Sequence, residues 1–528
     1  MNQSHAVLTG ISACKNSLVF DLHCQLPQAM VTVTVLEKHP YDLSFTESAL
    51  PEIPAADVML RGHALVFSIP RFDGARDRLC NQFNVMVTSG GAQVEAEGIR
   101  HVTDIGEIAE NTDPFPDPGT IKGLQVHDIA DAKALGIKHA GFNVNQPSLM
   151  RPAASADTIP YAMEGRVFHF DRNVVEQYDA HIRALSSLGA NVYLILLNSP
   201  TWSGTTIHPD MKAILFHPDF TEHDEEARIS AFNTVTPEGF AHYKAFIGFI
   251  CQRYMGKTGA FGRAQGLIIS NEVNSQYVWG NAGEKTVEAF ASLYAIAMRT
   301  AWYVMQTYAS SGRVYLSLEH HWTLAYKPDP KRYYGGRELL DALISLSVRD
   351  GNYDWGLAHH PYPESLFHCD FWNDVTATDS FDAGRITFKN LQVLARYMNL
   401  PVNLYRGRCR PVILSEQGFH CEYTAEWEAM QKAAYCLAYE KVLKLPDIDC
   451  FIYHAHHDNK FEFGLNLGVR RRDEAGNPTD PKPIYEAMRD IDTDKRTALL
   501  EEARAYLGKH LDGHTAIDYG PGGQDPLP

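Results

Sequence analysis

The sequence lacks the features that mark membrane proteins and proteins that bind nucleic acids. Its longest apolar runs, such as residues 192–197, are far too short to cross a bilayer. Basic residues are few: 47 Lys and Arg stand against 64 Asp and Glu, a formal net charge of −17. Because nucleic acids and anionic membranes are bound through basic surfaces, we expect neither as a partner.

Three further patterns are absent. The nine cysteines contain no Cys-x-x-Cys pair, and their odd number leaves at least one thiol unpaired in a monomer, so we expect reduced thiols. Residues 1–5 show no basic segment followed by an apolar one, so we expect no export signal and a cytoplasmic location. No Gly-x-Gly-x-x-Gly follows an early strand, which argues against a dinucleotide-binding open sheet.

What is present is a composition that can form a large core, with 45% hydrophobic and 21% charged residues. The first part of the chain has short β-rich runs between Pro, Gly and Asp turns, at 17–24, 30–37, 64–69 and 82–88. They predict a small β-sandwich-like accessory domain over 1–110, followed by a Pro-rich linker at 111–118. Its role stays open between carbohydrate binding, covering a barrel edge and dimerisation, and the oligomeric state, a homodimer included, stays open with it.

After the linker, apolar strand-like runs alternate with helical stretches eight times. This alternation predicts a (β/α)8 TIM barrel over 119–510 and a tail at 511–528, with an open doubly wound sheet as the main competitor. The predicted strands are 121–126, 137–144, 191–197, 266–270, 314–318, 355–358, 411–415 and 449–453. The predicted helices are 127–135, 173–188, 237–255, 286–308, 337–347, 387–398, 425–443 and 484–507.

Two of the predicted strands end in a carboxylate. Glu272 follows the fourth strand in an Asn271-Glu272 pair, and Glu416 follows Ser415 at the end of the seventh. A charge next to an apolar strand is costly unless it is paired or functional. The carboxyl ends of all barrel strands meet at one mouth. There, one carboxylic acid can protonate a glycosidic oxygen while a second carboxylate attacks the anomeric carbon.

With His-His-Pro-Tyr at 359–362, after strand six, these motifs resemble the retaining glycoside hydrolases of clan A, and among them a poorly characterised bacterial branch. The resemblance implies that Glu272 is the acid/base, that Glu416 is the nucleophile and that Asn271 binds the sugar 2-hydroxyl. It further implies that Tyr362 hydrogen-bonds Glu416 and that His360 contacts the substrate. We expect burial and the charge of Glu416 to raise the pKa of Glu272.

Other candidate substrate-binding residues also follow predicted strands. Clan A enzymes often have a Trp after strand eight and an Arg after strand two, where this chain has His454 and Asn143. Indole faces can stack on a pyranose ring, and His and Asn side chains can exchange hydrogen bonds with its hydroxyls. The further candidates of these types are Trp202, Trp279, His320 and Asn198.

We expect no metal and no other cofactor. Amidohydrolase-like barrels bind metal through residues placed as His320, His360 and Asp458 are here, but they also need His-x-His on strand one, where this chain has Val-His-Asp at 126–128. The predicted function is retaining hydrolysis of a β-linked glycoside in oligosaccharides, with the loops at 147–170 and 199–236 walling off a pocket. A metal-dependent amidohydrolase-like enzyme and a catalytically inactive carbohydrate-binding barrel stay open as alternatives.

Overall fold

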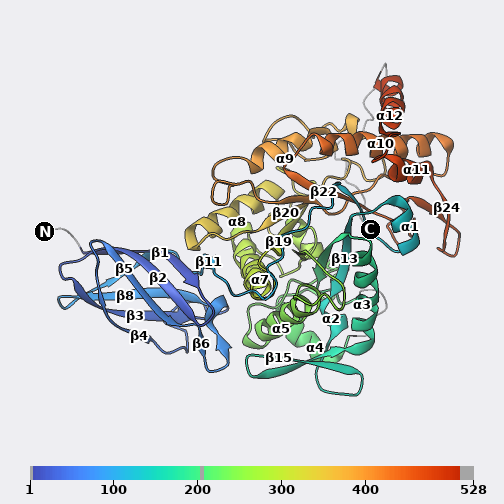
Figure 1. Ribbon diagram of the computed structural model, residues 1–528. Helices are drawn as coiled ribbons and strands as arrows, with labels where there is room; N and C mark the ends of the chain where they lie inside the picture. Colours follow the sequence, from blue (N-terminus) through green and yellow to red (C-terminus); the bar gives the residue numbers. More distant parts are fainter. Residues whose placement is uncertain (1–3, 202–206, 512–528) are drawn as a thin grey trace.

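The computed structural model describes residues 4–201 and 207–511 of the chain (Figure 1). Eight strands, hydrogen-bonded in chain order, close into a barrel that helices surround. Neighbouring strands run parallel, so the predicted (β/α)8 barrel is confirmed, with a strand-rich N-terminal region before it. The barrel strands are β12 (Lys122–Leu124), β13 (His139–Asn145), β17 (Asn191–Leu197), β18 (Gly266–Ile269), β19 (Arg313–Glu319), β20 (Gly356–His360), β21 (Val412–Leu414) and β22 (Ile448–Tyr453).

Side chains fill the inside of the barrel, and glycine makes room for the largest of them. Tyr193 and Tyr315 point inward and belong to one buried cluster with apolar side chains of the other strands. A Cβ atom on Gly266 would lie 2.7 Å from a ring carbon of Tyr193 and 2.9 Å from one of Tyr315. Because such contacts are too close, only glycine lets both rings pack here. The packed interior leaves the polar strand ends to form the mouth.

The principal helices begin at threonine caps. Thr236, Thr286 and Thr424 each accept a hydrogen bond from the backbone N–H three residues further on, at the starts of α5, α7 and α10. None of the helices in the described ranges is long and apolar enough to cross a membrane. The helices around the barrel are α1 (Ile129–Leu135), α3 (Arg172–Ser187), α5 (Pro237–Tyr254), α7 (Val287–Tyr308), α8 (Gly336–Asp350), α9 (Leu391–Met398) and α10 (Ala425–Leu443).

The predicted final helix at 484–507 is wrong in one respect. The structure has two helices there, α11 (Pro483–Asp490) and α12 (Arg496–Leu511). Thr493 donates both its backbone N–H and its hydroxyl to the Asp490 carbonyl. Short polar side chains that bond nearby backbone compete with the helical ladder, and the helix ends where they cluster. Of the predicted tail, residues 512–528 lie outside the described residues.

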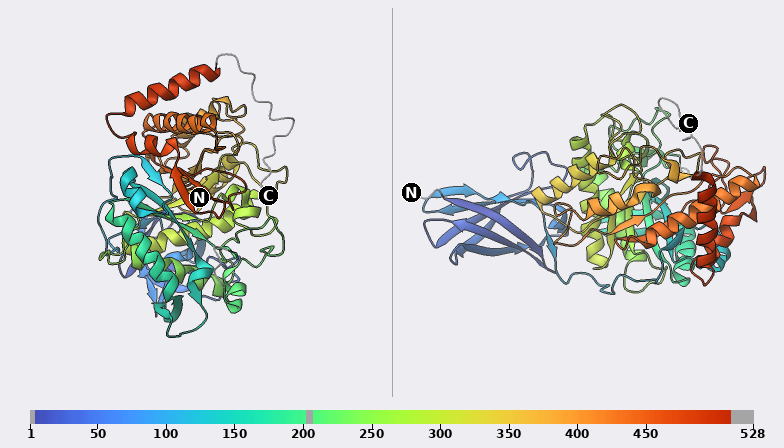
Figure 2. Two further views of the ribbon diagram at one scale, coloured as in Figure 1. Left: turned by 90° about the vertical axis from the view of Figure 1, so that its right-hand side faces the viewer. Right: turned by 90° about the horizontal axis from the view of Figure 1, so that it is seen from above.

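Most of the N-terminal strands form two sheets that face each other. One sheet has the order β10-β1-β2-β5, with β11 also paired to β1, and the other has the order β4-β3-β8-β9. Phe20 of β2 meets Phe83 of β8 edge to face, with 5.5 Å between ring centroids. Figure 2 shows the two sheets extending away from the barrel. The strands are β1 (His5–Ala13), β2 (Ser17–Gln25), β3 (Met30–Lys38), β4 (Ile53–Met59), β5 (Ala64–Pro70), β8 (Gln82–Ser89), β9 (Ala92–Glu95), β10 (Glu97–Gly98) and β11 (Asp104–Ile105).

The insertion after β13 forms a small antiparallel sheet instead of a wall around the mouth. Its strands are β14 (Met150–Arg151), β15 (Thr158–Met163) and β16 (Arg166–Asp171). Phe170 stacks on Phe249 of α5, with 3.8 Å between ring centroids. This insertion therefore packs on an outer helix, and the expectation that 147–170 walls off a pocket is wrong.

Candidate active site

A pocket lies at the carboxyl ends of the barrel strands. It encloses about 830 Å³, including the part open to solvent, and its residues come from the segments that follow β18, β19, β20, β21 and β22. Active sites of (β/α)8 enzymes lie at this end of the barrel. The polar and charged residues that line it include Asn271, Glu272, Ser275, Glu319, His320, His321, Tyr362, Glu416 and Glu462.

The backbone that carries Glu272 is strained. Ser270 has φ +64° and Glu272 has φ +41°, both in the left-handed backbone region that residues other than glycine seldom adopt. Each such residue costs on the order of 1–3 kcal/mol, and this strain is concentrated at functional sites. The backbone N–H of Glu272 donates to the Ser317 hydroxyl at 2.9 Å, which fixes the turn against β19.

Glu272 is paired with a neutral histidine. His360 Nδ1 lies 2.8 Å from Glu272 Oε1, and His360 Nε2 lies 2.9 Å from the Ser415 hydroxyl. Burial lowers the pKa of His360. Burial, and then the charge of Glu319, raise the pKa of Glu272 to about 8. The direction agrees with the prediction, but the neighbouring carboxylate responsible is Glu319 and not Glu416.

Glu416 accepts hydrogen bonds from two neutral donors. The Tyr362 hydroxyl donates to Oε1 at 3.2 Å, and the Gln125 amide donates to Oε2 at 3.3 Å. One oxygen of Glu416, one oxygen of Glu272 and one ring nitrogen of His360 all lie within 4.8 Å of one another. The two carboxylates therefore lie close together in the pocket.

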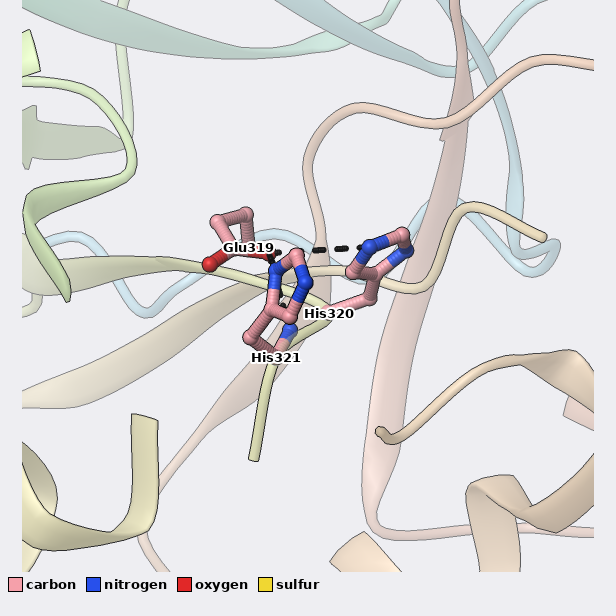
Figure 3. Close-up of side chains that lie close together, drawn as sticks. All are labelled: Glu319, His320 and His321. Carbon is pink, nitrogen blue, oxygen red and sulfur yellow. Dashed lines mark hydrogen bonds and ion pairs between the residues drawn. The ribbon is translucent and has the colours of Figure 1, made fainter. Parts of the chain in front are cut away.

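Glu319, at the end of β19, is a third buried carboxylate. Its Oε1 accepts from the Asn274 amide at 2.6 Å. Its Oε2 accepts from the backbone N–H and Nδ1 of His321 at 2.8 and 2.6 Å, and Figure 3 shows the His321 ring beside it. Burial raises the pKa of Glu319, but His321 and then His320 outweigh burial and hold the pKa below its usual range. Glu319 thus stays ionised and disfavours a second charge on Glu272.

Within residues 4–201 and 207–511, two groups of side chains lie close enough to hold a metal ion: Glu319, His320 and His321, and Glu272, His360 and Glu416. Two ligands about 2.1 Å from one tetrahedral ion lie roughly 3.4 Å apart. The imidazole–carboxylate contacts at 2.6 and 2.8 Å are shorter and have the geometry of hydrogen bonds. Asp458, the third ligand of the amidohydrolase pattern, accepts from the buried Lys482 ammonium at 2.9 Å. We therefore interpret both groups as hydrogen-bond networks.

The structure brings most of the predicted site residues together. Those that line the pocket are Asn271, Glu272, Trp279, His320, Tyr362 and Glu416. His360 does not line the pocket but hydrogen-bonds Glu272, which does. His454 hydrogen-bonds Gln125 at 2.8 Å and Glu462 at 3.0 Å. Their contacts with a sugar stay predictions.

Besides His360 and His454, three further predicted sugar ligands are not among the pocket residues that the structure describes. Asn198 is fully buried, and its amide donates to the carbonyls of Leu215 and Ala231 at 2.9 Å each, so it holds a loop and the expectation of sugar binding is corrected. Asn143 is opposite Ile195 in the barrel register, below the last residues of β13. Trp202 lies outside the described residues.

Sequence reasoning missed Gln125, Glu319 and Glu462. Gln125 and Glu319 stand at the carboxyl ends of β12 and β19, so the rule that identified Glu272 and Glu416 would have identified them too. Glu462 belongs to the loop after β22, where no strand end marks it.

Residues 114–512 match the family described as "Family of unknown function (DUF5722)". No curated protein matches the chain. Among solved structures, a family 39 glycoside hydrolase from Bacteroides cellulosilyticus WH2 is 13% identical, with 92% of this chain and 82% of that chain covered and a TM-score of 0.45. A β-glucosidase from Pyrococcus furiosus is 14% identical, with 72% of this chain and 86% of that chain covered and a TM-score of 0.44. A family 1 β-glucosidase from Thermotoga maritima is 12% identical, with 69% of this chain and 84% of that chain covered and a TM-score of 0.42.

Proposed function

Because the chain belongs to DUF5722, a family of unknown function, we propose its activity from the pocket itself: it is a retaining glycoside hydrolase that cleaves β-linked glycosides by double displacement. Glu416 is the nucleophile and Glu272 is the acid/base. Asn271, Tyr362 and Trp279 bind the sugar that occupies the pocket.

The spacing of the two carboxylates carries this proposal. Oxygens of Glu272 and Glu416 lie within 4.8 Å of each other. In retaining enzymes the carboxyl groups are about 5–5.5 Å apart, whereas inverting enzymes separate them by about 6.5–9.5 Å to admit a water. The observed spacing is closer to that of retaining enzymes than to that of inverting ones, and it supports direct attack by a carboxylate.

The protonation states support these roles. With a pKa of about 8, Glu272 carries its proton at neutral pH and can give it to the departing oxygen. Glu416 accepts hydrogen bonds from the Tyr362 hydroxyl and the Gln125 amide, which orient its side chain. A protonated Glu272 therefore faces a hydrogen-bonded Glu416.

The reaction has two steps. Glu416 attacks the anomeric carbon and forms an ester, the glycosidic C–O bond breaks, and the Glu272 proton moves to the leaving oxygen. Water then attacks the same carbon, Glu272 takes a proton from that water, and the Glu416 carboxylate is released. Two inversions give net retention at the anomeric carbon.

A second pocket favours oligosaccharides as substrates. It encloses about 820 Å³, including open solvent, and shares Val278, Trp279, Tyr326 and Phe463 with the first pocket. Because the two pockets share these wall residues, they adjoin, and a substrate longer than one sugar can extend from the first into the second. Its other lining residues are polar and charged, which suits a second sugar better than an alkyl group: Asp224, Glu225, Glu226, Arg228 and Lys327.

A panel of activated aryl β-glycosides tests the proposal, with NMR identifying the anomer released first. Wild type should release the β-anomer first, and Glu416→Ala and Glu272→Ala should each lose at least a thousandfold in kcat. Azide should rescue Glu416→Ala and yield an α-glycosyl azide. The exposed Glu426, changed to Ala in the same way, is the matched control and should keep wild-type activity.

Two outcomes contradict the proposal. First release of the α-anomer would mean inversion. No release across the panel, together with a melting temperature that rises when a sugar is added, would favour the inactive carbohydrate-binding barrel.

A further inference from the structure

A chain of hydrogen bonds runs from the loop after β22 to the carboxylate of Glu416. Glu462 Oε1 lies 3.0 Å from His454 Nε2, and His454 Nδ1 lies 2.8 Å from the Gln125 carbonyl oxygen. The Gln125 amide nitrogen then donates to Glu416 Oε2 at 3.3 Å. The side chains of His454 and Gln125 are largely buried, at 15% and 9% exposure.

The partners of each group fix the protons along this chain. The Glu416 carboxylate can only accept, so Gln125 must turn its NH2 group toward Glu416 and its carbonyl toward His454. Because that carbonyl also only accepts, His454 Nδ1 must carry a proton. Glu462 is a carboxylate as well, so His454 Nε2 must also carry one. The hydrogen-bond pattern alone therefore makes His454 an imidazolium.

The surrounding charges agree with this assignment. Burial lowers the pKa of His454, but Glu462, and then Glu416, outweigh it and raise the pKa to about 9. The imidazoles of His127 and His360 and the phenol of Tyr362 also act on this site. Burial lowers the pKa of both imidazoles and raises the pKa of Tyr362, so all three groups are neutral at pH 7 and leave the positive charge on His454.

We propose that Glu462, His454 and Gln125 form a relay of positioning residues that orients the carboxylate of Glu416 for attack. This inference rests on the proposed function. Glu462 fixes the imidazolium, the imidazolium fixes the Gln125 amide, and the amide N–H holds Glu416 Oε2. No proton moves along the relay. His454 thus acts through Gln125 and does not bind the sugar.

The relay explains how a neutral amide can be kept in one orientation. A free Gln side chain flips its amide easily, and the flipped form would place a carbonyl oxygen against the Glu416 carboxylate. The imidazolium opposes that flip, because it would then face an NH2 group. A substitution of any of the three relay residues should therefore disturb the orientation of the Glu416 carboxylate in the same way.

Three variants test the relay: Glu462→Gln, His454→Gln and Gln125→Ala. The measurement is kcat/KM as a function of pH, on an aryl β-glycoside that wild type cleaves. Each variant should lower kcat/KM about tenfold and move the acidic limb of the pH profile upward by about one pH unit. Both effects correspond to the loss of roughly one hydrogen bond to a charged group. The double variant Glu462→Gln/Gln125→Ala should lose no more than Gln125→Ala alone.

A matched control separates the relay from loss of stability. Glu428→Gln also removes a carboxylate from a partly buried pair, that with Arg471, and should leave the pH profile unchanged. The relay is overturned if the acidic limb stays in place, if the two losses add, or if the variants raise KM for some sugars only. The last result would mean that His454 contacts a hydroxyl.

A second measurement does not depend on activity. Nitrogen-15 NMR of His454 at pH 7 should show both ring nitrogens protonated in wild type and a neutral ring in Glu462→Gln. A neutral His454 in wild type overturns the relay even if the aryl-glycoside panel supports the proposed function. If instead the panel shows no hydrolysis but His454 is an imidazolium, the proposed function fails and the hydrogen-bond assignment stands.

Discussion

Replacing Glu272 by glutamine should make the barrel less sensitive to alkaline pH. Glutamine has the shape of a protonated glutamic acid but cannot ionise. The pKa of Glu272 is raised from 4.5 to about 8 by burial and by Glu319. Wild type therefore binds a proton in the folded state that the unfolded chain has lost, throughout the range between these two values.

The sign and the size follow from linkage. The stabilisation that Glu272 contributes as a neutral acid is complete below pH 4.5 and is lost as the pH rises through about 8. A shift of about 3.5 units at about 1.36 kcal/mol each amounts to roughly 5 kcal/mol. For 528 residues, an unfolding entropy of roughly 1.1 kcal/mol/K converts this into a melting-temperature difference of about 4 °C.

Thermal unfolding of wild type and Glu272→Gln at pH 4.5, 7 and 9 measures this difference. The melting temperature of the variant minus that of wild type should be about 4 °C higher at pH 9 than at pH 4.5. The exposed Glu426, changed to Gln, should follow wild type at every pH. A difference between wild type and Glu272→Gln that does not change with pH would refute the assignment of Glu272 as a neutral acid, because only a proton held by the folded state makes it vary.

Three other predictions concern the walls of the site. Tyr362→Phe removes the donor 3.2 Å from Glu416 and should lower kcat about tenfold with KM unchanged; an unchanged kcat would contradict it. Trp279→Ala should raise KM for oligosaccharides more than for aryl glycosides, since Trp279 lines both pockets; equal effects would place both substrates in one pocket. Gly418→Ala would bring a Cβ atom within 1.9 Å of the His454 carbonyl and should lower the melting temperature by several degrees; an unchanged value would contradict the close approach.

The barrel was predictable because its strands are buried on both faces. The run Asn191–Leu197 is apolar at almost every position, so its bounds in the structure equal the predicted ones. The outer strands of the N-terminal sheets were harder to recognise. Strand β4 begins Ile-Pro and alternates weakly, and prolines are typical of sheet edges, where pairing with one neighbour suffices. Tertiary contacts, and not the local pattern, decide such strands.

The site was predictable only as far as the strand ends define it. The strand-end rule located Glu272 and Glu416, because parallel strands deliver their last residues to one mouth. It could not show that His454 pairs with Glu462, because Glu462 lies eight residues further along, in a loop whose path depends on the whole barrel mouth. The rule therefore predicted that His454 binds the sugar, whereas in the structure both of its ring nitrogens are hydrogen-bonded to protein side chains.

The partners of the four carboxylates decide which of them can attack a sugar. Glu272 is neutralised by its own proton, and Glu462 is paired with the imidazolium of His454. Both oxygens of Glu319 are occupied by bonds as short as 2.6 Å, which hold its lone pairs. Glu416 receives only long bonds, at 3.2 and 3.3 Å, from neutral donors within the described residues. These long bonds orient the Glu416 carboxylate and leave it a lone pair to give, which supports the proposal that Glu416 is the nucleophile.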